Sequence, residues 1–344
     1  MKVKLGELTK IRTGKLDANA SSPDGEYPFF TCSKEPLKIS SYSYDCECVL
    51  VAGNGDLNVK YYNGKFDAYQ RTYIIEDNSN GRLYLPYLYY FMNGYVEELR
   101  KLSIGGVIKY IKLRNLTDAL IELPEIETQK YIVSILSKIK ELIDFRYQEL
   151  KMLENLIKAR FIELFGEPLS NQKGWQTMSI VEAAPIKSQR GDLGDEVWLL
   201  NLDAVEAQTG TVLFKHRVQS GKINASTVFF TTESVLYSKL RPYLNKVVMP
   251  NEDGVATSEM IPMYPLADRL NRAYLCYWLR SDAFVRHISE KVAGAKMPRV
   301  SMDYFRSLAI ELPPLELQGQ FADFVAQIDK SKHNFSSSSL FSVF

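Results

Sequence analysis

The chain has few of the residues on which most enzymes depend. Its 344 residues include four cysteines and three histidines, no CxxC pair occurs, and no histidine has a second ligand at metal-binding spacing. Reduced, mostly buried thiols are therefore expected, and no zinc site. The sequence also lacks a GxGxxG stretch after a strand, a GxxxxGKS/T loop and a GxSxG elbow, which serve dinucleotide, phosphate and acyl-transfer chemistry. We predict no catalytic residues and no metal, and therefore a protein that is not an enzyme.

Long hydrophobic runs and an excess of one charge are missing as well. No segment of about eighteen uncharged apolar residues occurs, and the N-terminal MKVKLGELTK lacks the apolar core of a signal peptide. We therefore predict a cytoplasmic protein without a membrane contact. The formal net charge is +1, so any surface for nucleic acid must be local. The length favours two domains over one.

One unusual segment occurs twice. IELPEIETQ begins at Ile121 and IELPPLELQ begins at Ile310, which is 189 positions later (310 minus 121). Two blocks upstream repeat at offsets of 187 (274 minus 87) and 186 (234 minus 48): YLYYF and YLCYW, from Tyr87 and Tyr274, and CVLV and SVLY, from Cys48 and Ser234. Three matching blocks in one order, with a slowly drifting offset, indicate a duplicated module of roughly 150 residues with variable loops.

After each IELP segment the pattern becomes helical. From Glu125 to Phe165, apolar residues recur at alternating steps of three and four, which is typical of paired helices. Pro124 suits the start of this helix, and Gly166 with Pro168 would end it. A shorter helix after Leu315 continues in the same way, so we predict an antiparallel helix pair that also serves a partner. The predicted interface residues are Ile132, Leu136, Ile139, Ile143, Leu150, Leu153, Ile157, Phe321, Val325 and Ile328.

The module before each helix mixes strands and helices, so its predicted class is α+β. CECVLVAGNGDL indicates a strand followed by a turn, because residues 53–56 are Gly-Asn-Gly-Asp. VKYYNGKFD favours a hairpin around Asn63 and Gly64. YLPYLYYFMN is typical of a buried helix.

Cationic stretches recur at matching places in the two modules. Residues 99–117 contain five lysines and arginines, residues 291–302 contain three, and neither stretch contains an acid. Each includes a glycine, Gly105 and Gly294, at the offset of 189 (294 minus 105). A cationic loop with glycine lets backbone and side chains approach phosphates closely. A solvated surface loop is the alternative interpretation.

Two other stretches carry side chains that suit DNA. SKLRPYLNK from Ser238 surrounds an aromatic ring with cations and an asparagine, and DAYQRTY from Asp67 offers a glutamine and an arginine. Arginine and asparagine can recognise guanine and adenine edges, and lysine neutralises phosphate. The predicted DNA-binding residues are Lys60, Gln70, Arg71, Lys109, Lys112, Lys239, Arg241, Tyr243, Asn245, Lys246, Lys296 and Arg299.

Jointly these features resemble one family, the specificity subunits of type I restriction–modification systems. The resemblance covers about residues 1–333 and rests on the duplicated layout, the LPxxExQ segments (Leu123–Gln129 and Leu312–Gln318) and VLYSKLRPYLNKV (Val235–Val247). It implies an α+β protein with two similar globular target-recognition domains, separated by an antiparallel pair of long helices with pseudo-two-fold symmetry. The corresponding ranges are recognition domains at 1–123 and 168–312, a central helix at 124–167, a shorter C-terminal helix at 313–333 and a disordered tail at 334–344.

The resemblance also implies a function without catalysis by this chain. Each domain would recognise one half of an asymmetric bipartite site in double-stranded DNA, and the helices would dock two modification (methyltransferase) subunits. Those partners would carry S-adenosylmethionine and methylate adenine N6, so no cofactor is expected on this chain. Two restriction (endonuclease) subunits would complete the assembly. Two alternatives stay open: a coiled-coil interaction scaffold without DNA recognition, and a nuclease with an unrecognised site.

Overall fold

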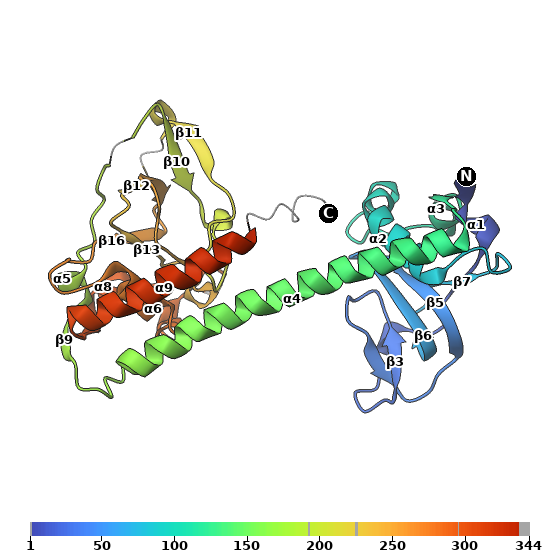
Figure 1. Cartoon of the computed structure of the whole chain (residues 1–344), viewed down its shortest axis with the longest axis horizontal. Helices are drawn as coiled ribbons and strands as arrows, with labels where there is room; N and C mark the ends of the chain where they lie inside the picture. Colours follow the sequence, from blue (N-terminus) through green and yellow to red (C-terminus); the bar gives the residue numbers. More distant parts are fainter. Residues whose placement is uncertain (1, 192, 224–225, 295, 337–344) are drawn as a thin grey trace. The chain divides into compact units, whose positions relative to one another are not determined.

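The computed structural model describes residues 2–191, 193–223, 226–294 and 296–336, the last four without their side chains. The chain divides into two compact units, residues 1–146 (unit 1) and 147–344 (unit 2), coloured from blue to red in Figure 1. The long helix α4 (Ile126–Phe165) contributes its first part to unit 1 and the rest to unit 2. Both units mix helices and strands, which confirms the α+β prediction. Within the described ranges, no helix combines the length and apolar character that crossing a membrane requires.

Unit 1 is built on a six-stranded sheet with the strand order β2-β7-β5-β6-β3-β4. A separate two-stranded ribbon pairs β1 with β8. The elements before α4 are β1 (Lys2–Lys4), α1 (Leu5–Leu8), β2 (Thr9–Thr13), the 3₁₀ helix η1 (Ala18–Ala20), β3 (Tyr27–Phe30), β4 (Leu37–Ile39), β5 (Tyr44–Ala52), β6 (Val59–Ala68), β7 (Thr72–Asp77), α2 (Leu85–Leu102), α3 (Leu113–Thr117) and β8 (Leu120–Glu122).

The central strand β5 distributes its apolar residues between two cores. Successive side chains of a strand point to opposite faces, so Val49 and Val51 join the cluster that α2 covers, whereas Cys48 and Leu50 join the cluster on the other face. The predicted buried helix is confirmed as α2, which packs over β5 and β6. Its buried residues recur at steps of three and four: Leu85, Leu88, Met92, Val96 and Leu99.

The hairpin predicted at Asn63 and Gly64 is wrong. β6 continues through both residues, and Gly64, at φ 136°, lies opposite Cys46 in the ladder with β5. Asn-Gly favours a tight turn locally, but here the flanking residues pair with β5 along most of the strand. Pairing with a neighbouring strand therefore outweighs the local turn preference.

Unit 2 contains a four-stranded sheet of order β11-β10-β15-β12 and a three-stranded sheet of order β14-β13-β16. Two short ribbons pair β17 with β18 and β19 with β9. The elements are β9 (Gln176–Ser179), α5 (Ile180–Ala183), β10 (Glu196–Leu200), η2 (Leu202–Ala204), β11 (His216–Gln219), η3 (Ser220–Lys222), β12 (Thr227–Phe230), β13 (Val235–Ser238), η4 (Pro242–Leu244), β14 (Val247–Val248), β15 (Gly254–Thr257), β16 (Met260–Met263), α6 (Arg272–Arg280), α7 (Asp282–Ser289), β17 (Val292–Ala293), β18 (Arg299–Val300), α8 (Met302–Ser307), β19 (Ala309–Leu312) and α9 (Leu315–Ser336).

The repeated IELP segment forms the same strand in both units. In unit 1, Ile121 of β8 lies opposite Val3 of β1, and in unit 2, Ile310 of β19 lies opposite Met178 of β9. Both isoleucines are fully buried. A four-residue helix, α1 or α5, follows the partner strand in each case. The segment thus ties the end of each module to its beginning, just before the chain enters α4 or α9.

A buried glutamine then holds the start of each helix. The Gln129 side chain accepts a hydrogen bond from Tyr84 N (2.8 Å) and donates to the carbonyl oxygens of Arg82 and Pro124 (2.8 Å each). Gln318 makes the three equivalent bonds in unit 2. It accepts from Asn271 N (2.7 Å) and donates to Arg269 O (3.1 Å) and Pro313 O (2.7 Å). Both side chains are 0% exposed. These two clamps fix α4 and α9 against α2 and α6, because an unmade bond would leave a buried polar group.

A tyrosine bond accompanies each clamp. Tyr87 donates its hydroxyl to Glu122 O at 2.9 Å, and Tyr274 donates to Glu311 O at 3.0 Å. In unit 2 the Glu311 carboxylate is also buried, where it accepts from Trp278 Nε1 (2.6 Å) and Leu169 N (2.8 Å). The LPxxExQ segments therefore correspond to a repeated joint between a globular module and its helix.

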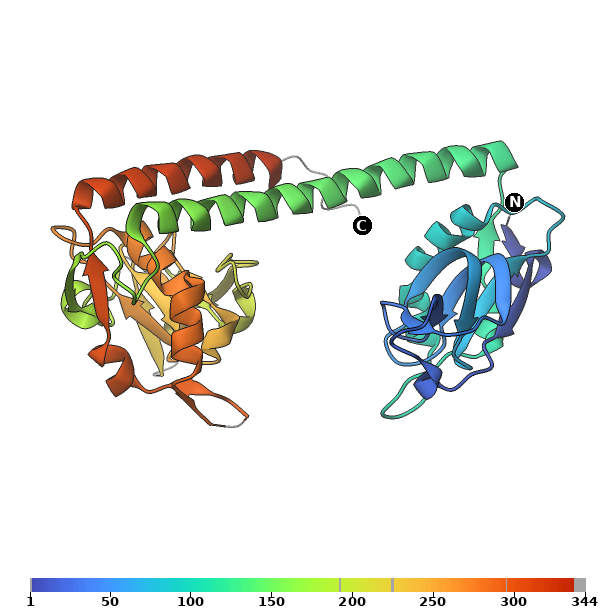
Figure 2. The ribbon, with the colours of Figure 1, turned by 90° about the horizontal axis from the view of Figure 1, so that it is seen from below.

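Helix α9 runs antiparallel to the last part of α4 within unit 2 (Figures 1 and 2). Phe321, near the start of α9, packs edge-on against Phe165, whereas Lys332, near its end, binds Glu154 at 2.5 Å. Glu154 also lies 3.5 Å from the buried guanidinium of Arg280 in α6. α4 ends at Phe165, followed by Gly166 at φ 81°, as the glycine predicted.

The predicted interface residues lie in three settings. Phe321, Val325 and Ile157 are buried in the core of unit 2, with Ile328 packed at its edge. α9 has 22 residues against 40 in α4, so it covers only the C-terminal part of the longer helix. The remaining predicted residues are half-buried along α4: Ile132, Leu136, Ile139 and Ile143 in unit 1, and Leu150 and Leu153 in unit 2. α9 extends to Ser336, and the rest of the predicted tail, residues 337–344, lies outside the described residues.

Candidate nucleic-acid interface

Two distant stretches of unit 1 meet at one end of its sheet. The turn after β5, residues 53–56, lies beside a hairpin loop formed by residues 104–111. Ile104 and Tyr110 exchange backbone hydrogen bonds (2.8 and 2.9 Å), Gly55 N donates to Lys109 O (3.0 Å), and Ile111 N donates to Gly53 O (2.9 Å). This arrangement, here called the loop frame, projects from unit 1 on the side away from α4 (Figure 2).

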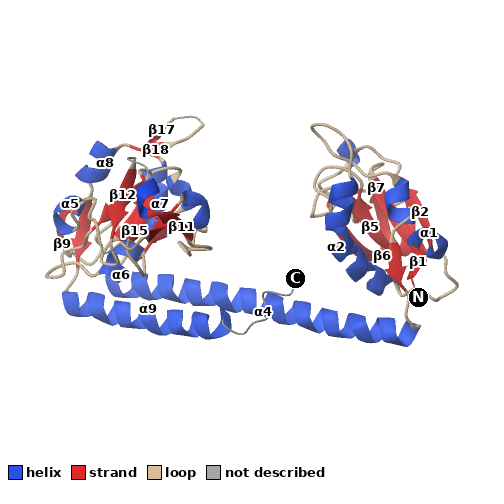
Figure 3. Cartoon of the chain, turned by 90° about the horizontal axis from the view of Figure 1, so that it is seen from above, coloured by secondary structure: helices blue, strands red, loops and turns tan. Residues whose placement is uncertain are grey.

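Unit 2 contains the same loop frame. Ala293 of β17 pairs with Arg299 of β18, Arg241 N donates to Pro298 O (2.8 Å), and Val300 N donates to Lys239 O (3.0 Å). Each partner corresponds to its counterpart in unit 1 at the offsets of 186 and 189 seen in the sequence. In Figure 3 the β17–β18 hairpin projects from unit 2 on the side opposite α9. The structure thus joins two repeated blocks that the sequence left separate.

A glycine with positive φ shapes both hairpin loops. Gly105 has φ 117° and Gly294 has φ 100°, a region that other residues adopt at a cost. A Cβ at Gly105 would lie 2.6 Å from Ile108 O, and one at Gly294 would lie 3.2 Å from Met297 O. The same close approach, three residues along the chain, recurs in both loops. The glycines therefore have a steric reason in addition to any approach to phosphate.

The side chains on the two loop frames differ. Arg241 stands where unit 1 has Gly55, and both are left-handed, at φ 50° and φ 68°. Arg71 O accepts from Gly53 N, and Glu259 O accepts from Lys239 N, so an arginine in unit 1 corresponds to a glutamate in unit 2. Such exchanges on a constant backbone change the chemistry that each frame presents.

In unit 1 the predicted DNA-binding residues surround the loop frame. Lys109 and Lys112 are exposed, and neither forms an ion pair within the described residues. Gln70 and Arg71 are exposed beside the 53–56 turn. Lys60 is half-buried and hydrogen-bonded to Asn58 Oδ1, and burial lowers the pKa of its ammonium group. Four of the five residues are thus accessible to a ligand.

In unit 2 some of the predicted DNA-binding side chains are exposed, whereas others are half-buried or already form an ion pair. Arg241, Tyr243 and Lys296 are exposed, whereas Lys239 is half-buried. Arg299 forms a forked ion pair with Glu259, with Nε and Nη2 at 3.0 and 2.8 Å from Oε1. This pair occupies the guanidinium and neutralises its charge.

Two predicted contacts of unit 2 have structural partners instead. Asn245 is 3% exposed and donates its amide to Arg280 O at 3.0 Å. Lys246 donates to Leu202 O at 2.6 Å, and desolvation lowers the pKa of its ammonium group. Both side chains are therefore held inside the unit, and their placement gives no support to the DNA contacts expected of them. The sequence could not reveal this, because Arg280, whose carbonyl oxygen accepts from Asn245, lies 35 residues away along the chain.

Sequence reasoning missed the apolar tips of the loops. Val107 is fully exposed, and Ile108 and Met297 are 63% and 47% exposed. The signal was available: each follows a repeated glycine within a cationic stretch. Apolar residues in such a stretch are easily taken for core residues until the turn geometry is known.

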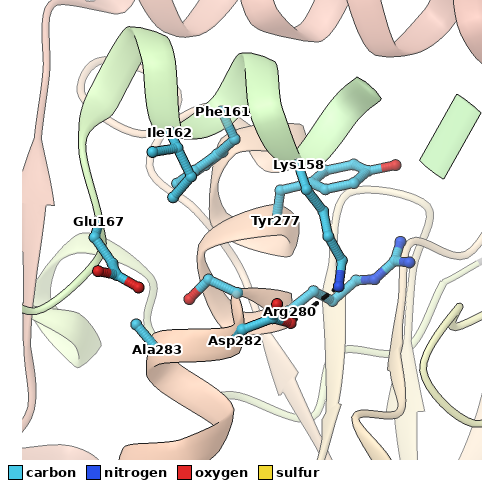
Figure 4. Close-up of a pocket in the computed structure, with 9 residues that line it drawn as sticks. Lys158, Phe161, Ile162, Glu167, Tyr277, Arg280, Asp282 and Ala283 are labelled. Atoms are coloured by element: carbon cyan, nitrogen blue, oxygen red, sulfur yellow. Dashed lines mark hydrogen bonds and ion pairs between the residues drawn. The ribbon is translucent and has the colours of Figure 1, made fainter. Parts of the chain in front are cut away.

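A pocket of about 120 Å³ lies where α4 ends against α6 and α7 of unit 2. Phe161 and Ile162 line one side, and Tyr277 lies on the other beside Lys158, which forms an ion pair with Asp282 at 2.9 Å (Figure 4). The lining lacks a nucleophile paired with a base. Among the described residues, no cluster of three or more metal-ligating side chains is present either.

A family model for the type I restriction modification DNA specificity domain matches residues 1–155 and 173–337. The chain belongs to this family. The two matched ranges correspond to the two halves of the duplication.

Individual relatives agree with that assignment. The chain is 28% identical to the type I restriction enzyme EcoDI specificity subunit of Escherichia coli over 362 residues, covering 95% of this chain and 80% of that protein. It is 22% identical to the type I restriction enzyme MjaVIII specificity subunit of Methanocaldococcus jannaschii over 373 residues, covering 95% and 85%.

Solved structures share the fold. A crystal structure of a type I restriction–modification S subunit from M. genitalium aligns with a TM-score of 0.59 and 15% identity, over 98% of this chain and 91% of that one. A chain from a study of complex assembly and conformational transition of the type I R-M system aligns with a TM-score of 0.53 and 17% identity, over 97% and 91%.

Proposed function

We propose that this specificity subunit recognises an asymmetric, bipartite site in double-stranded DNA, one half through each loop frame. Its helices dock two methyltransferase subunits, which hold S-adenosylmethionine and methylate adenine N6, and two endonuclease subunits complete the assembly in the cytoplasm. This chain contributes recognition and spacing and no catalytic group.

One observation carries the proposal: the two units keep the backbone of the loop frame and change its side chains. A constant frame presents residues at the same place relative to a ligand, and a change such as Gly55 in unit 1 to Arg241 in unit 2 adds a base-reading side chain to one unit only, so the two units select different bases. The exposed cations near the frame of unit 1, Lys109 and Lys112, supply the phosphate attraction that any duplex offers. Phosphate contacts position the protein, and base contacts specify the sequence.

The surface of α4 supports partner docking. Large apolar side chains along it stay exposed: Tyr131 (65%), Leu142 (60%), Phe145 (65%) and Met152 (67%). Exposed apolar surface of this kind is typical of a protein–protein interface. The same observation favours the second candidate function, a helical scaffold without DNA recognition, which leaves the duplicated cationic loops without a role.

A selection experiment separates the two. The full chain, co-purified with its methyltransferase subunit, is incubated with a pool of random duplexes at two salt concentrations, and bound DNA is sequenced. We expect enrichment of one split motif with a fixed gap, and methylome sequencing of cells that carry the complex should show adenine methylation at that motif. A scaffold gives no enrichment at either salt concentration.

A second assay addresses catalysis. The purified chain alone, given duplex DNA and labelled S-adenosylmethionine, should transfer no methyl group above a mock purification. With Mg²⁺ instead, it should leave the duplex intact. Metal-dependent cutting by the chain alone would make it a nuclease and overturn the proposal.

A further inference from the structure

The hairpin loop of unit 1 carries two adjacent apolar side chains at its tip. Val107 is fully exposed and Ile108 is 63% exposed. Single exposed apolar residues are common on protein surfaces, but these two are adjacent and lie in the middle of the hairpin loop 104–111. Of the five lysines and arginines between Leu99 and Thr117, Arg100 and Lys101 pair with acids, whereas Lys109 and Lys112 are exposed and form no ion pair among the described residues. Lys109 and Lys112 thus favour a polyanion, while Val107 and Ile108 have no charge to offer.

Unit 2 repeats one of the two apolar positions: Met297 stands where unit 1 has Ile108, whereas the exposed Lys296 stands where unit 1 has Val107. Met297 follows Gly294 by three residues, as Ile108 follows Gly105, and its side chain is 47% exposed. Most other side chains of the loop frame differ between the units, including Lys109 and Pro298. An exposed apolar residue therefore persists where the chemistry around it changes.

Hydrogen bonds hold the hairpin loop of unit 1, residues 104–111, in a fixed position. Backbone bonds join Ile104 to Tyr110 and Gly55 to Lys109, and Tyr73 donates its hydroxyl to Ile111 O at 3.2 Å. The close approach of Gly105 to Ile108 O sets the direction of the tip. A fixed loop loses little conformational entropy on binding.

Two parts of DNA offer apolar surface to such a tip, the faces of the bases and the methyl group of thymine, and only the base faces are large enough to cover both Val107 and Ile108. Phosphates and sugars bind cations and hydrogen-bond donors, whereas base faces are apolar, and DNA-binding proteins unstack base steps with inserted apolar side chains. Resting on the proposed function, we infer that Val107 and Ile108 insert against a base step in the half-site of unit 1 and partly unstack it. Met297 does the same in the other half-site.

The test uses the full chain with its methyltransferase subunit and the duplex that the selection enriches. Val107→Ser with Ile108→Ser removes the apolar tip, and because both side chains are exposed the fold should be kept. Leu120→Ser, at an exposed apolar site in β8 (54%) outside the loop frame, is the control. We expect the double variant to bind roughly ten- to hundredfold more weakly, as losing apolar burial of this size predicts, and the control to bind like the parent.

Two readouts distinguish insertion from ordinary contact. An apolar contact releases no counterions, so the dependence of affinity on salt should keep the slope of the parent. 2-Aminopurine placed in turn at each adenine of the half-site should brighten at one step on binding the parent, and not on binding the double variant.

Four outcomes would overturn the inference and leave the proposed function intact. A double variant with parental affinity, a reduced salt slope, or no 2-aminopurine signal with the parent would rule out insertion. A variant that binds DNA normally but loses its methyltransferase subunit would make the tip a protein-docking site. If the selection enriches no duplex, the proposed function itself fails.

Discussion

The loop frames of the two units share their backbone hydrogen bonds and differ in their side chains. Gly53 and Lys239, or Gly55 and Arg241, make the same main-chain bonds to the hairpin beside them. Main-chain bonds do not depend on residue type, so the frame persists while its side chains vary. The clamps at Gln129 and Gln318 differ from the frames in this respect, because there the side chain itself makes the bonds and cannot vary freely.

The largest effect is expected from exchanging a whole predicted recognition domain. Replacing residues 168–312 with the matching domain of a related subunit should change one half of the methylated motif completely and leave the other half and the gap intact. The physical reason is that, under the proposed function, the base-edge contacts for one half-site, worth about 1–3 kcal/mol each, come from one unit. Methylome sequencing measures the result. A change in both halves would contradict independent recognition.

The glutamine clamps should give the next largest effect. Gln129→Leu and Gln318→Leu each leave buried polar groups without partners, so each should lower the stability of its unit by about 2–4 kcal/mol. All three tryptophans, Trp175, Trp198 and Trp278, lie in unit 2. Tryptophan fluorescence during urea unfolding should therefore shift for Gln318→Leu and stay unchanged for Gln129→Leu, which hydrogen exchange reports instead.

The exposed Gln148 on α4 provides the control for both clamps. Gln148→Leu should unfold like the parent by either method. If all three variants unfold at the same urea concentration as the parent and exchange hydrogen at the same rate, the clamps contribute no stability.

Phosphate contacts should differ between the units to a smaller extent. Lys109 forms no ion pair among the described residues, so Lys109→Ala should weaken binding to all sequences about equally and lower the salt slope by about one. Arg299 is already neutralised by Glu259, so Arg299→Ala should lower the slope by less. Fluorescence anisotropy at several salt concentrations measures both. Equal slopes for the two variants would show that the ion pair opens on binding.

The smallest effect is expected at the left-handed backbone position that Gly55 in unit 1 and Arg241 in unit 2 share. Arg241→Gly should stabilise unit 2 by about 0.5–1 kcal/mol, because glycine adopts positive φ without a Cβ penalty. Gly55→Ala should destabilise unit 1 by a similar amount, since a Cβ there meets nothing within 4 Å and only the backbone angle opposes it. Urea unfolding measures both. If Arg241→Gly is less stable than the parent, the arginine is held by contacts and is not strained.

The duplicated architecture and the helices could be predicted from the sequence alone. Repeats such as IELP keep their spacing, and the 3.6-residue period of a buried helical face is visible along a single segment, as in α2 and the end of α4 at Gly166. The two cationic glycine loops could also be found from the offset between Gly105 and Gly294. These are local or periodic signals, and they need no knowledge of what packs against them.

Only the tertiary structure decided which separate segments form one surface. It brought residues 53–56 beside residues 104–111, paired Arg299 with Glu259, and turned Asn245 inward against Arg280. It also drew Asn63 and Gly64 into β6, against their local preference for a turn. Each result depends on hydrogen bonds between residues far apart in the chain. The free energy of these bonds exceeds the conformational preference of any short segment, and no local sequence pattern indicates which distant residues will pair.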